Sequence, residues 1–508
     1  MANGLKRLYE EVCRYAVETS RWGSIASVLH WDERTMMPPA GGENRAEQIT
    51  LVAGFCHKRW VDPKFVEQVG ELAESPLIDE PQSDAAVNIR RLKRDVDKRT
   101  KLPQALVEEL TRTAVLGQQV WEKARAENDF AAFRPILEKT IGLKRQEAEA
   151  LGYPQCPYDA LLDEYEPEML TADAAKVLAG LREQLVPLVG AIRESGRQPD
   201  VSILTRKFPI DRQESFGRKA AAAIGFDFNR GRLDVTAHPF CTGLGPNDCR
   251  ILTRYDEGYF NGAFFGILHE SGHGIYDQGL PREHYGLPLG EAVSLGIHES
   301  QSRLWENLVG RSRAFWEYFY PDAREHFPDA LGDVPLDDFY FAINDVRPSL
   351  VRVEADEATY NLHILVRFEL EQALLDGDLP VADLPGAWNE KYRKYLGVAP
   401  SGDADGVLQD VHWSGGAVGY FPTYTLGNLN ASQLFAKAQQ DLGNLDDQFA
   451  RGEFLPLRQW LGEKIHWQGR RWSAAELVER VTGKPLGPEP LMEHLRAKLG
   501  PLYGITHG

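Results

Sequence analysis

Cysteine is scarce in this sequence of 508 residues, and the five cysteines are scattered along it: Cys13, Cys56, Cys156, Cys241 and Cys249. Their number is odd, and no C-x-x-C pair occurs. The sequence therefore predicts neither a disulfide framework nor a cysteine-based zinc site, and it favours a reducing compartment.

Basic charge and long apolar runs are lacking as well. Lys and Arg number 57 against 75 Asp and Glu, a net charge of −18, which argues against nucleic acid as the main partner. No apolar run approaches the roughly 20 residues of a membrane span, and the first 20 residues lack the apolar core of a signal peptide. We expect a cytoplasmic protein that binds neither nucleic acid nor membrane.

Nucleotide and serine-hydrolase signatures are missing too, because no P-loop, dinucleotide fingerprint or G-x-S-x-G elbow occurs. What the sequence does contain is helical periodicity. Apolar residues recur at helix spacing in 5–16, in 106–121 and after Thr171, which we interpret as a helix cap, and Ser473 with Glu476 predicts a capping box.

Strand patterns are confined to two short segments. Residues 232–240 alternate in polarity and 249–255 are rich in β-formers, with a glycine- and proline-containing loop between them. No repeat or shift in composition marks a boundary. The sequence predicts an all-α, mainly helical protein with a small antiparallel β element, folded as one domain over 1–508.

Histidine is scarce too, with 13 residues, yet two stand four apart in "HESGH". The surrounding run 259–281 reads as a buried helix, so His269 and His273 would share one face. This H-E-x-x-H pattern predicts a metal site, since two buried imidazoles without a partner would be costly. The alternatives are two core histidines bonded to carbonyls and a purely structural zinc.

A third ligand is expected from 290–310, which we interpret as another helix. Glu299 borders its apolar side and would complete a His₂Glu zinc site. Its rivals are Glu291, Glu306 and His298. A bound zinc lowers the pKa of water toward about 7 and polarises a carbonyl, and Glu270 would act as general base in amide hydrolysis.

Two further candidates lie in the glycine-rich segment 409–427. Tyr420 could stabilise the oxyanion of the tetrahedral intermediate with His412 in support, although both could equally be packed loop residues. His238 precedes Pro239 at the end of the proposed strand, which could pair with the substrate backbone.

Eight segments, taken together, resemble the carboxypeptidase Taq family of zinc metallocarboxypeptidases from about residue 5 to 503. They are "HWDERTMMP" (30–38), "HPF" (238–240), "DCRILT" (248–253), "HESGH" (269–273), "HESQ" (298–301), "VRVEAD" (351–356), "ATYNLHI" (358–364) and "GVLQDVHWS" (406–414). The resemblance implies a helical homodimer with a deep central groove. It also implies removal of C-terminal residues other than proline from peptides, with Zn²⁺ replaceable by Co²⁺ or Mn²⁺.

The same resemblance assigns site residues. His269, His273 and Glu299 fall on the metal positions and Glu270 on the general base. Arg352 falls on an arginine that holds the substrate's free C-terminal carboxylate, and Arg250 on a second basic group in the groove. From the residues alone, Arg352 could instead pair with Glu354, Asp356 or another acid. Val351 replaces a common isoleucine, and the second motif reads D-x-R-x-x-T.

Two other functions compete with that of a carboxypeptidase. A metallo-endopeptidase or dipeptidyl-type peptidase needs the same metal, water and glutamate, so only recognition of the substrate terminus separates it. A helical binding protein with a structural zinc would have an incomplete catalytic set, whereas every expected group is present here.

Overall fold

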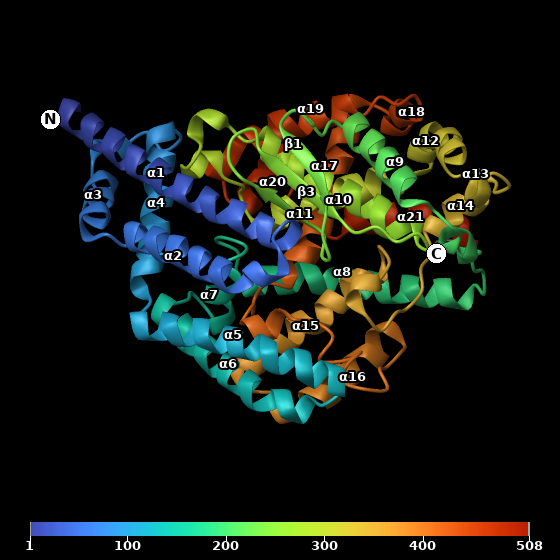
Figure 1. Cartoon of the computed structure of the whole chain (residues 1–508), viewed down its shortest axis with the longest axis horizontal. Coiled ribbons are helices and arrows are strands. Elements are labelled where there is room, and N and C mark those ends of the chain that lie inside the picture. The colour runs from blue at the N-terminus through green and yellow to red at the C-terminus, as the bar shows by residue number, and fades with distance from the viewer. Residues whose placement is uncertain (1, 506–508) are drawn as a thin grey trace.

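The computed structural model describes residues 2–505, and most of this part of the chain is α-helical (Figure 1). The first stretch contains α1 (Ala2–Thr35), α2 (Gly42–Trp60), α3 (Pro63–Ala73), α4 (Asp84–Lys101), α5 (Gln104–Glu127) and α6 (Phe130–Leu151). The middle of the chain contains α7 (Pro157–Leu162), α8 (Thr171–Glu194), α9 (Ile210–Ala223), β1 (Gly231–Val235), β2 (Phe240–Gly243), β3 (Cys249–Thr253), α10 (Phe260–Gly279) and α11 (Leu295–Arg303). After a π-helical turn at Leu304–Val309 follow α12 (Arg313–His326), α13 (Pro328–Leu331), α14 (Leu336–Ile343), α15 (Thr359–Asp376), α16 (Leu384–Leu396), α17 (Pro422–Leu442), α18 (Leu445–Ala450), α19 (Leu455–Lys464), α20 (Ala474–Thr482) and α21 (Glu489–Tyr503).

Two helix starts test the capping rules. Ser473 and Glu476 form the predicted capping box at α20, each accepting a backbone N–H of the other's residue. The prediction for α8 was wrong in detail, because Thr171 is the first helical residue and not the cap. Its backbone N–H donates instead to the carboxylate of Asp159 at 2.8 Å, a partner 12 residues away that local sequence does not reveal.

The small β element is confirmed, but it is a mixed sheet and not purely antiparallel. Its strand order is β1-β3-β2. β1 pairs with β3 in parallel, with Gly231 opposite Cys249, and β2 pairs with β3 in antiparallel register. The predicted strand 232–240 ends at Val235, and the expected loop supplies β2 (Phe240–Gly243). β2 leads into β3 as an antiparallel pair, and β1 occupies the other edge of β3.

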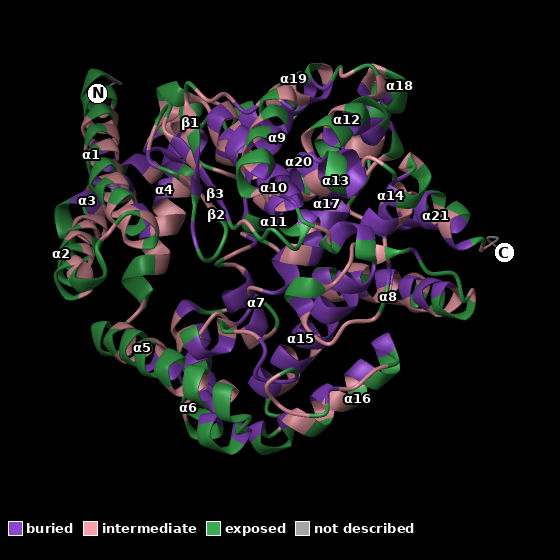
Figure 2. Cartoon of the chain, turned by 45° about the vertical axis from the view of Figure 1, so that its right-hand side comes forward, coloured by how far each residue is buried: buried purple, intermediate pink, exposed green. Residues whose placement is uncertain are grey.

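The buried residues gather around the central helices (Figure 2). One large hydrophobic cluster surrounds α10 and α12, and another surrounds α15 and α8. α17 contributes Leu434 to the first cluster and Leu429 to the second, so this buried helix joins the two. A smaller cluster holds α1, α3 and α4 together.

Two glycines allow the central helices to approach closely. α11 packs against both α10 and α17. A Cβ at Gly272 of α10 would lie 2.5 Å from the carbonyl oxygen of Gln301 in α11, and a Cβ at Gly427 of α17 would lie 2.5 Å from Cγ of Glu299. Both distances are shorter than any carbon contact allows, so a side chain at either position would push α11 away.

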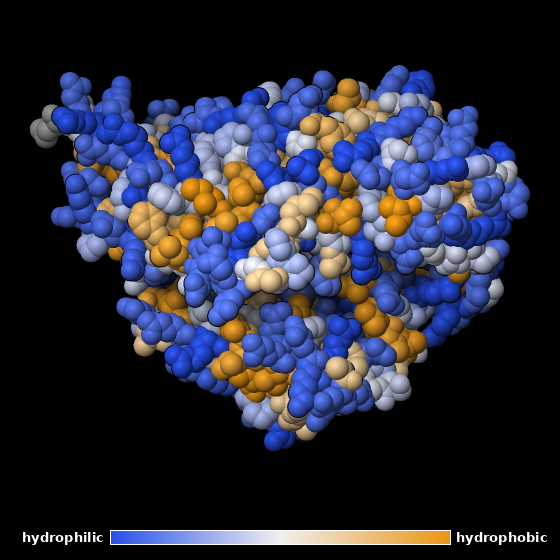
Figure 3. Space-filling view, viewed as in Figure 1, coloured by the Kyte–Doolittle hydropathy of each residue, from blue (hydrophilic) through white to orange (hydrophobic). Residues whose placement is uncertain are grey.

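The face shown in Figure 3 is typical of a globular protein. Hydrophilic residues dominate the rim of the face in Figure 3, and hydrophobic residues form patches across its middle. Within residues 2–505, none of the helices combines the length with the apolar character that a membrane crossing requires.

Candidate metal centre and active site

His269 and His273 project from one face of α10, and Glu299 of α11 faces both. The two imidazole rings lie 4.9 Å apart between centroids. Oε2 of Glu299 is 3.6 Å from Nε2 of His269 and 3.4 Å from Nε2 of His273. These three donor atoms lie within 4.8 Å of one another. Two imidazole nitrogens and one carboxylate oxygen converging in this way form a donor set that fits a divalent zinc ion.

The opposite ring nitrogens of both histidines are already engaged. Nδ1 of His269 lies 2.9 Å from Oε2 of Glu306. Nδ1 of His273 lies 2.6 Å from Nδ1 of His298, whose Nε2 lies 3.0 Å from Oδ1 of Asp277. When both Nδ1 atoms carry the proton and donate, the Nε2 lone pairs point toward Glu299. Partners of this kind commonly orient metal-binding histidines.

The three rival ligands therefore take other places. Glu306 and His298 contact the Nδ1 atoms, on the far side of the rings from Glu299. Glu291 pairs with Arg470 at 2.9 Å. The expected helix 290–310 begins only at Leu295, capped by Ser294, and continues from Leu304 as the π-helical turn that carries Glu306.

The carboxylate of Glu299 is buried and held from two sides. Arg303, one turn further along, donates Nε–H to its Oε1 at 2.7 Å, and the hydroxyl of Ser302 donates to its Oε2 at 3.0 Å. Burial alone would raise the pKa of Glu299, but the charges of Arg303 and His269 outweigh it and hold the pKa well below the usual range. Glu299 is thus ionised and ready to bind a cation.

Glu270 follows His269 directly and is itself buried, with 6% of its surface exposed. Burial raises the pKa of Glu270 to about 7, with the charge of His269 opposing the rise and that of Glu299 adding to it. A carboxyl group in this range can both accept and release a proton near neutral pH.

Arg352 lies in a buried cluster of charged side chains near α15. Its Nε and Nη2 donate to Oδ1 of Asp410 at 3.0 and 2.8 Å, and its Nη1 donates to the hydroxyl of Tyr360 at 2.9 Å. The fully buried Arg367 donates its Nε–H to the other oxygen of Asp410 at 2.6 Å. Arg352 therefore pairs with an acid other than Glu354 or Asp356, and two arginines share one carboxylate.

Tyrosines connect this charge cluster with the candidate metal triad, which consists of His269, His273 and Glu299. The guanidinium of Arg303, which holds Glu299, lies 4.5 Å from the ring centroid of Tyr360, whose hydroxyl accepts from Arg352. The Arg352 guanidinium also lies 5.1 Å from the ring centroid of Tyr424. The sequence interpretation missed Tyr360, Tyr424 and Arg367, because nothing local distinguishes them from packed helix residues.

His412 and Tyr420 meet in the same region, with ring centroids 5.3 Å apart. Nε2 of His412 lies 3.4 Å from the hydroxyl of Tyr424. Burial lowers the pKa of His412 to about 4, with Asp410 opposing the change, so its imidazole is neutral at neutral pH. A neutral imidazole stabilises an oxyanion less than a protonated one does, which leaves the tyrosine hydroxyls as the stronger donors.

Arg250 and His238 belong to the sheet region and not to α10 or α11. Arg250 follows Cys249, whose side chain faces α10, so Arg250 projects from the opposite face of β3. Its guanidinium lies 4.1 Å from the ring centroid of Trp31 and donates to Asp248 at 3.0 Å. His238 is exposed in the bend between β1 and β2.

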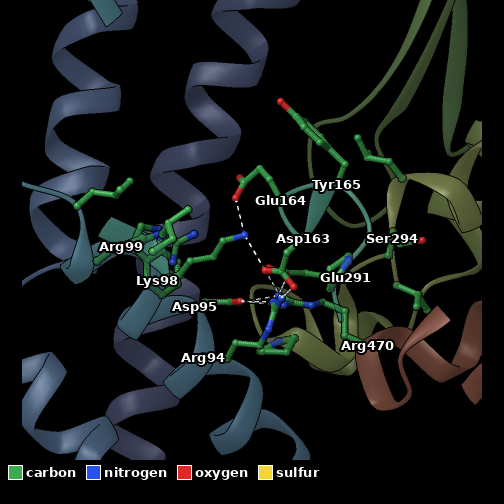
Figure 4. Close-up of a pocket in the computed structure, with 18 of the residues that line it drawn as sticks. Arg94, Asp95, Lys98, Arg99, Asp163, Glu164, Tyr165, Glu291, Ser294 and Arg470 are labelled. Atoms are coloured by element: carbon green, nitrogen blue, oxygen red, sulfur yellow. Dashed lines mark hydrogen bonds and ion pairs between the residues drawn. The ribbon is translucent and has the colours of Figure 1, made fainter. Parts of the chain in front are cut away.

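A cavity of about 610 Å³ adjoins the start of α11, next to Ser294 and Leu295. Figure 4 shows basic and acidic side chains meeting in it, with Lys98 between Asp163 and Glu164. Tyr165 lines this cavity and packs edge-on against Tyr420, with ring centroids 5.0 Å apart. The cavity thus lies beside the candidate site, and its charges are largely paired.

A helical scaffold that carries H-E-x-x-H with a following glutamate ligand defines a metallopeptidase type of centre. The model of the carboxypeptidase Taq (M32) metallopeptidase family matches residues 11–499. The chain belongs to this family.

Relatives of known activity support the same conclusion. The chain is 49% identical to thermostable carboxypeptidase 1 of Thermus thermophilus over 505 residues, covering 98% of this chain and 99% of that protein. It is 40% identical to carboxypeptidase 1 of Bacillus subtilis, covering 95% and 96%. The crystal structure of the M32 carboxypeptidase from Deinococcus radiodurans R1 superimposes with a TM-score of 0.95 at 41% identity, covering 98% and 100%. The chain is a metallocarboxypeptidase, a hydrolase that acts on peptides and needs a metal cofactor.

Proposed function

We propose that this metallocarboxypeptidase holds Zn²⁺ with His269, His273 and Glu299 and removes C-terminal residues from peptides with broad specificity, excluding C-terminal proline. The observation that carries the proposal is the convergence of three donor atoms from His269, His273 and Glu299. The Nδ1 atoms of both histidines already have partners, which leaves their Nε2 atoms for the metal. Co²⁺ or Mn²⁺ would also fit, because a His₂Glu site accepts several divalent ions.

A Zn²⁺ ion held by His269, His273 and Glu299 would supply Lewis acidity, which would lower the pKa of water and polarise the scissile carbonyl. Glu270 takes the proton from the attacking water on its carboxylate and later donates it to the leaving amine. Burial raises the pKa of Glu270 to about 7, which supports a role for this carboxyl group in proton transfer. Burial of the site excludes competing water from the carboxylate.

Arg352 holds the substrate's terminal carboxylate in this proposal. Its guanidinium already donates to Asp410, yet Asp410 carries one negative charge against two positive ones on Arg352 and Arg367. The cluster keeps a net positive charge, which suits an anionic terminus, and the arginine fork can bind a carboxylate in two places.

The hydroxyl of Tyr420 donates a hydrogen bond to the oxyanion of the tetrahedral intermediate. His412 positions the neighbouring tyrosines. The packing of His412 against Tyr420 and its contact with Tyr424 support this arrangement. Arg250 and His238 are proposed to contact the substrate through the sheet that carries them. The cytoplasmic location, the homodimer and the single domain stay predictions from the sequence.

The competing proposal is an endopeptidase that uses the same metal and the same glutamate. One N-blocked peptide in two forms, with a free C-terminal carboxylate and amidated, separates the two by mass spectrometry. We expect stepwise loss of C-terminal residues from the free form alone, abolished by Glu270→Gln. Internal cleavage of both forms would contradict the assignment of Arg352 as an anchor for the terminus.

A further inference from the structure

A second group of metal-binding side chains lies one turn along α10 from the metal triad. Asp277 follows His273 by four residues and so shares its helix face. Across from it stand two thiols of the sheet, Cys241 on β2 and Cys249 on β3. The sulfurs lie 3.6 Å apart, and Sγ of Cys249 lies 3.9 Å from Oδ2 of Asp277. Like the triad, these three donor atoms lie within 4.8 Å of one another.

We propose that Cys241, Cys249 and Asp277 form a second metal site that binds a thiophilic divalent cation such as zinc, cobalt or cadmium. With metal–sulfur bonds of about 2.3 Å, two thiolates on a tetrahedral ion stand about 3.8 Å apart. The observed 3.6 Å is close to this separation. Two soft thiolates and one carboxylate carry three negative charges, and a divalent cation that displaces the thiol protons neutralises two of them.

The backbone leaves room for an ion beside the carboxylate. Gly243 stands directly opposite Cys249 in the β2–β3 register. A Cβ at this position would lie 3.2 Å from Oδ2 of Asp277, so the glycine keeps space free next to the donor oxygen. The side chain of Asp277 retains 21% exposure and Cys241 is half-buried, which gives an ion a path from solvent.

A disulfide between the same cysteines is the rival interpretation, and the sheet geometry disfavours it. Cys241 pairs with Ile251, and Cys249 pairs with Gly243, so the two cysteines are diagonal neighbours. Diagonal neighbours lie about 7–8 Å apart between Cα atoms, whereas a disulfide requires about 4.4–6.8 Å. A bridging ion spans the wider separation without moving the strands, and it also accounts for the carboxylate beside the thiols.

The two sites are connected, although the proposal does not depend on the catalytic role of the first. Oδ1 of Asp277 faces Nε2 of His298, which contacts His273, while Oδ2 faces Cys249. One carboxylate therefore orients a ligand of the triad with one oxygen and offers the other oxygen to the second ion.

Cobalt distinguishes the sites, because only a cobalt–thiolate bond gives a sulfur-to-metal charge-transfer band in the near ultraviolet. The full-length, reduced and metal-free protein is titrated with Co²⁺, following this band and the bound cobalt per chain. We expect two ions per chain and a band that disappears in Cys241→Ser/Cys249→Ser, which then binds one ion. The matched control Cys56→Ser, which removes a thiol of α2, should keep the band and both ions.

Two further variants separate this inference from the catalytic proposal. His269→Ala should lose the triad ion while keeping the sulfur band, and Gly243→Ala should weaken cobalt binding at the thiols at least tenfold while keeping both sulfurs. One ion per chain without a sulfur band, even at millimolar cobalt, would overturn the second site. A band that survives in the double serine variant, or a disulfide found in place of bound metal, would overturn it as well.

Discussion

The close approach of α17 to α11 offers a test of how Glu299 is positioned. In Gly427→Ala the added methyl group would lie 2.5 Å from Cγ and 2.7 Å from Cβ of Glu299. Ordinary carbon contacts are about 3.5–4.0 Å, so Glu299 or α17 must move by about 1 Å. Overpacking of this size costs about 1–3 kcal/mol of folding free energy. Metal–ligand distances tolerate only about 0.2 Å, so we expect metal affinity to fall at least about tenfold.

Chelator competition measures the metal affinity, and urea unfolding of the metal-free protein measures the stability. The matched control is Gly190→Ala in α8, where a Cβ meets no atom within 4 Å. This control should leave metal affinity unchanged and stabilise the protein by roughly 0.5–1 kcal/mol, because alanine restricts the unfolded chain. If Gly427→Ala binds metal and unfolds as the wild type does, the close approach does not position Glu299.

Three other perturbations have defined outcomes. Arg352→Gln should lower kcat/KM for a free-carboxylate peptide about 100-fold, since a buried charged partner is lost, while Glu354→Gln in the same turn should not; equal effects would contradict the anchor. Glu306→Gln should weaken metal binding about 10- to 100-fold in chelator competition, with exposed Glu317→Gln as the neutral control. Glu166 is buried beside Gly296, and burial raises the pKa of its carboxyl group to about 8. The contribution of this group to the free energy of unfolding should therefore fall as pH rises from about 4.5 through about 8. Urea midpoints should therefore show Glu166→Gln gaining on the wild type over that range, and parallel pH profiles would refute the ionisation.

The folding of the central helices could be predicted from local sequence, and the sheet could not. The run around His269 has helical apolar spacing over 20 residues and forms α10 (Phe260–Gly279). In contrast, β1 and β3 pair in parallel, with Gly231 opposite Cys249, through contacts that no short pattern specifies. The start of α8 shows the same limit, because the acceptor for the Thr171 N–H is Asp159 on another helix.

The candidate site divides along the same line. H-E-x-x-H places the two proposed histidine ligands and the proposed base within five residues, so helix geometry alone predicts that His269 and His273 converge. Predicting Glu299 as the third ligand required only one further helix, the one expected over 290–310. Asp410 could not be assigned as the partner of Arg352, because 58 residues separate them and several acids lie nearer in sequence. The burial of charge explains the position of Asp410. Arg367 is fully buried and needs a counter-ion, and the carboxylate of Asp410 is the counter-ion of both arginines. In the proposed mechanism the substrate carboxylate would enter a cluster with one positive charge to spare, so an acid beside Arg352 is compatible with the proposed role of Arg352 as anchor.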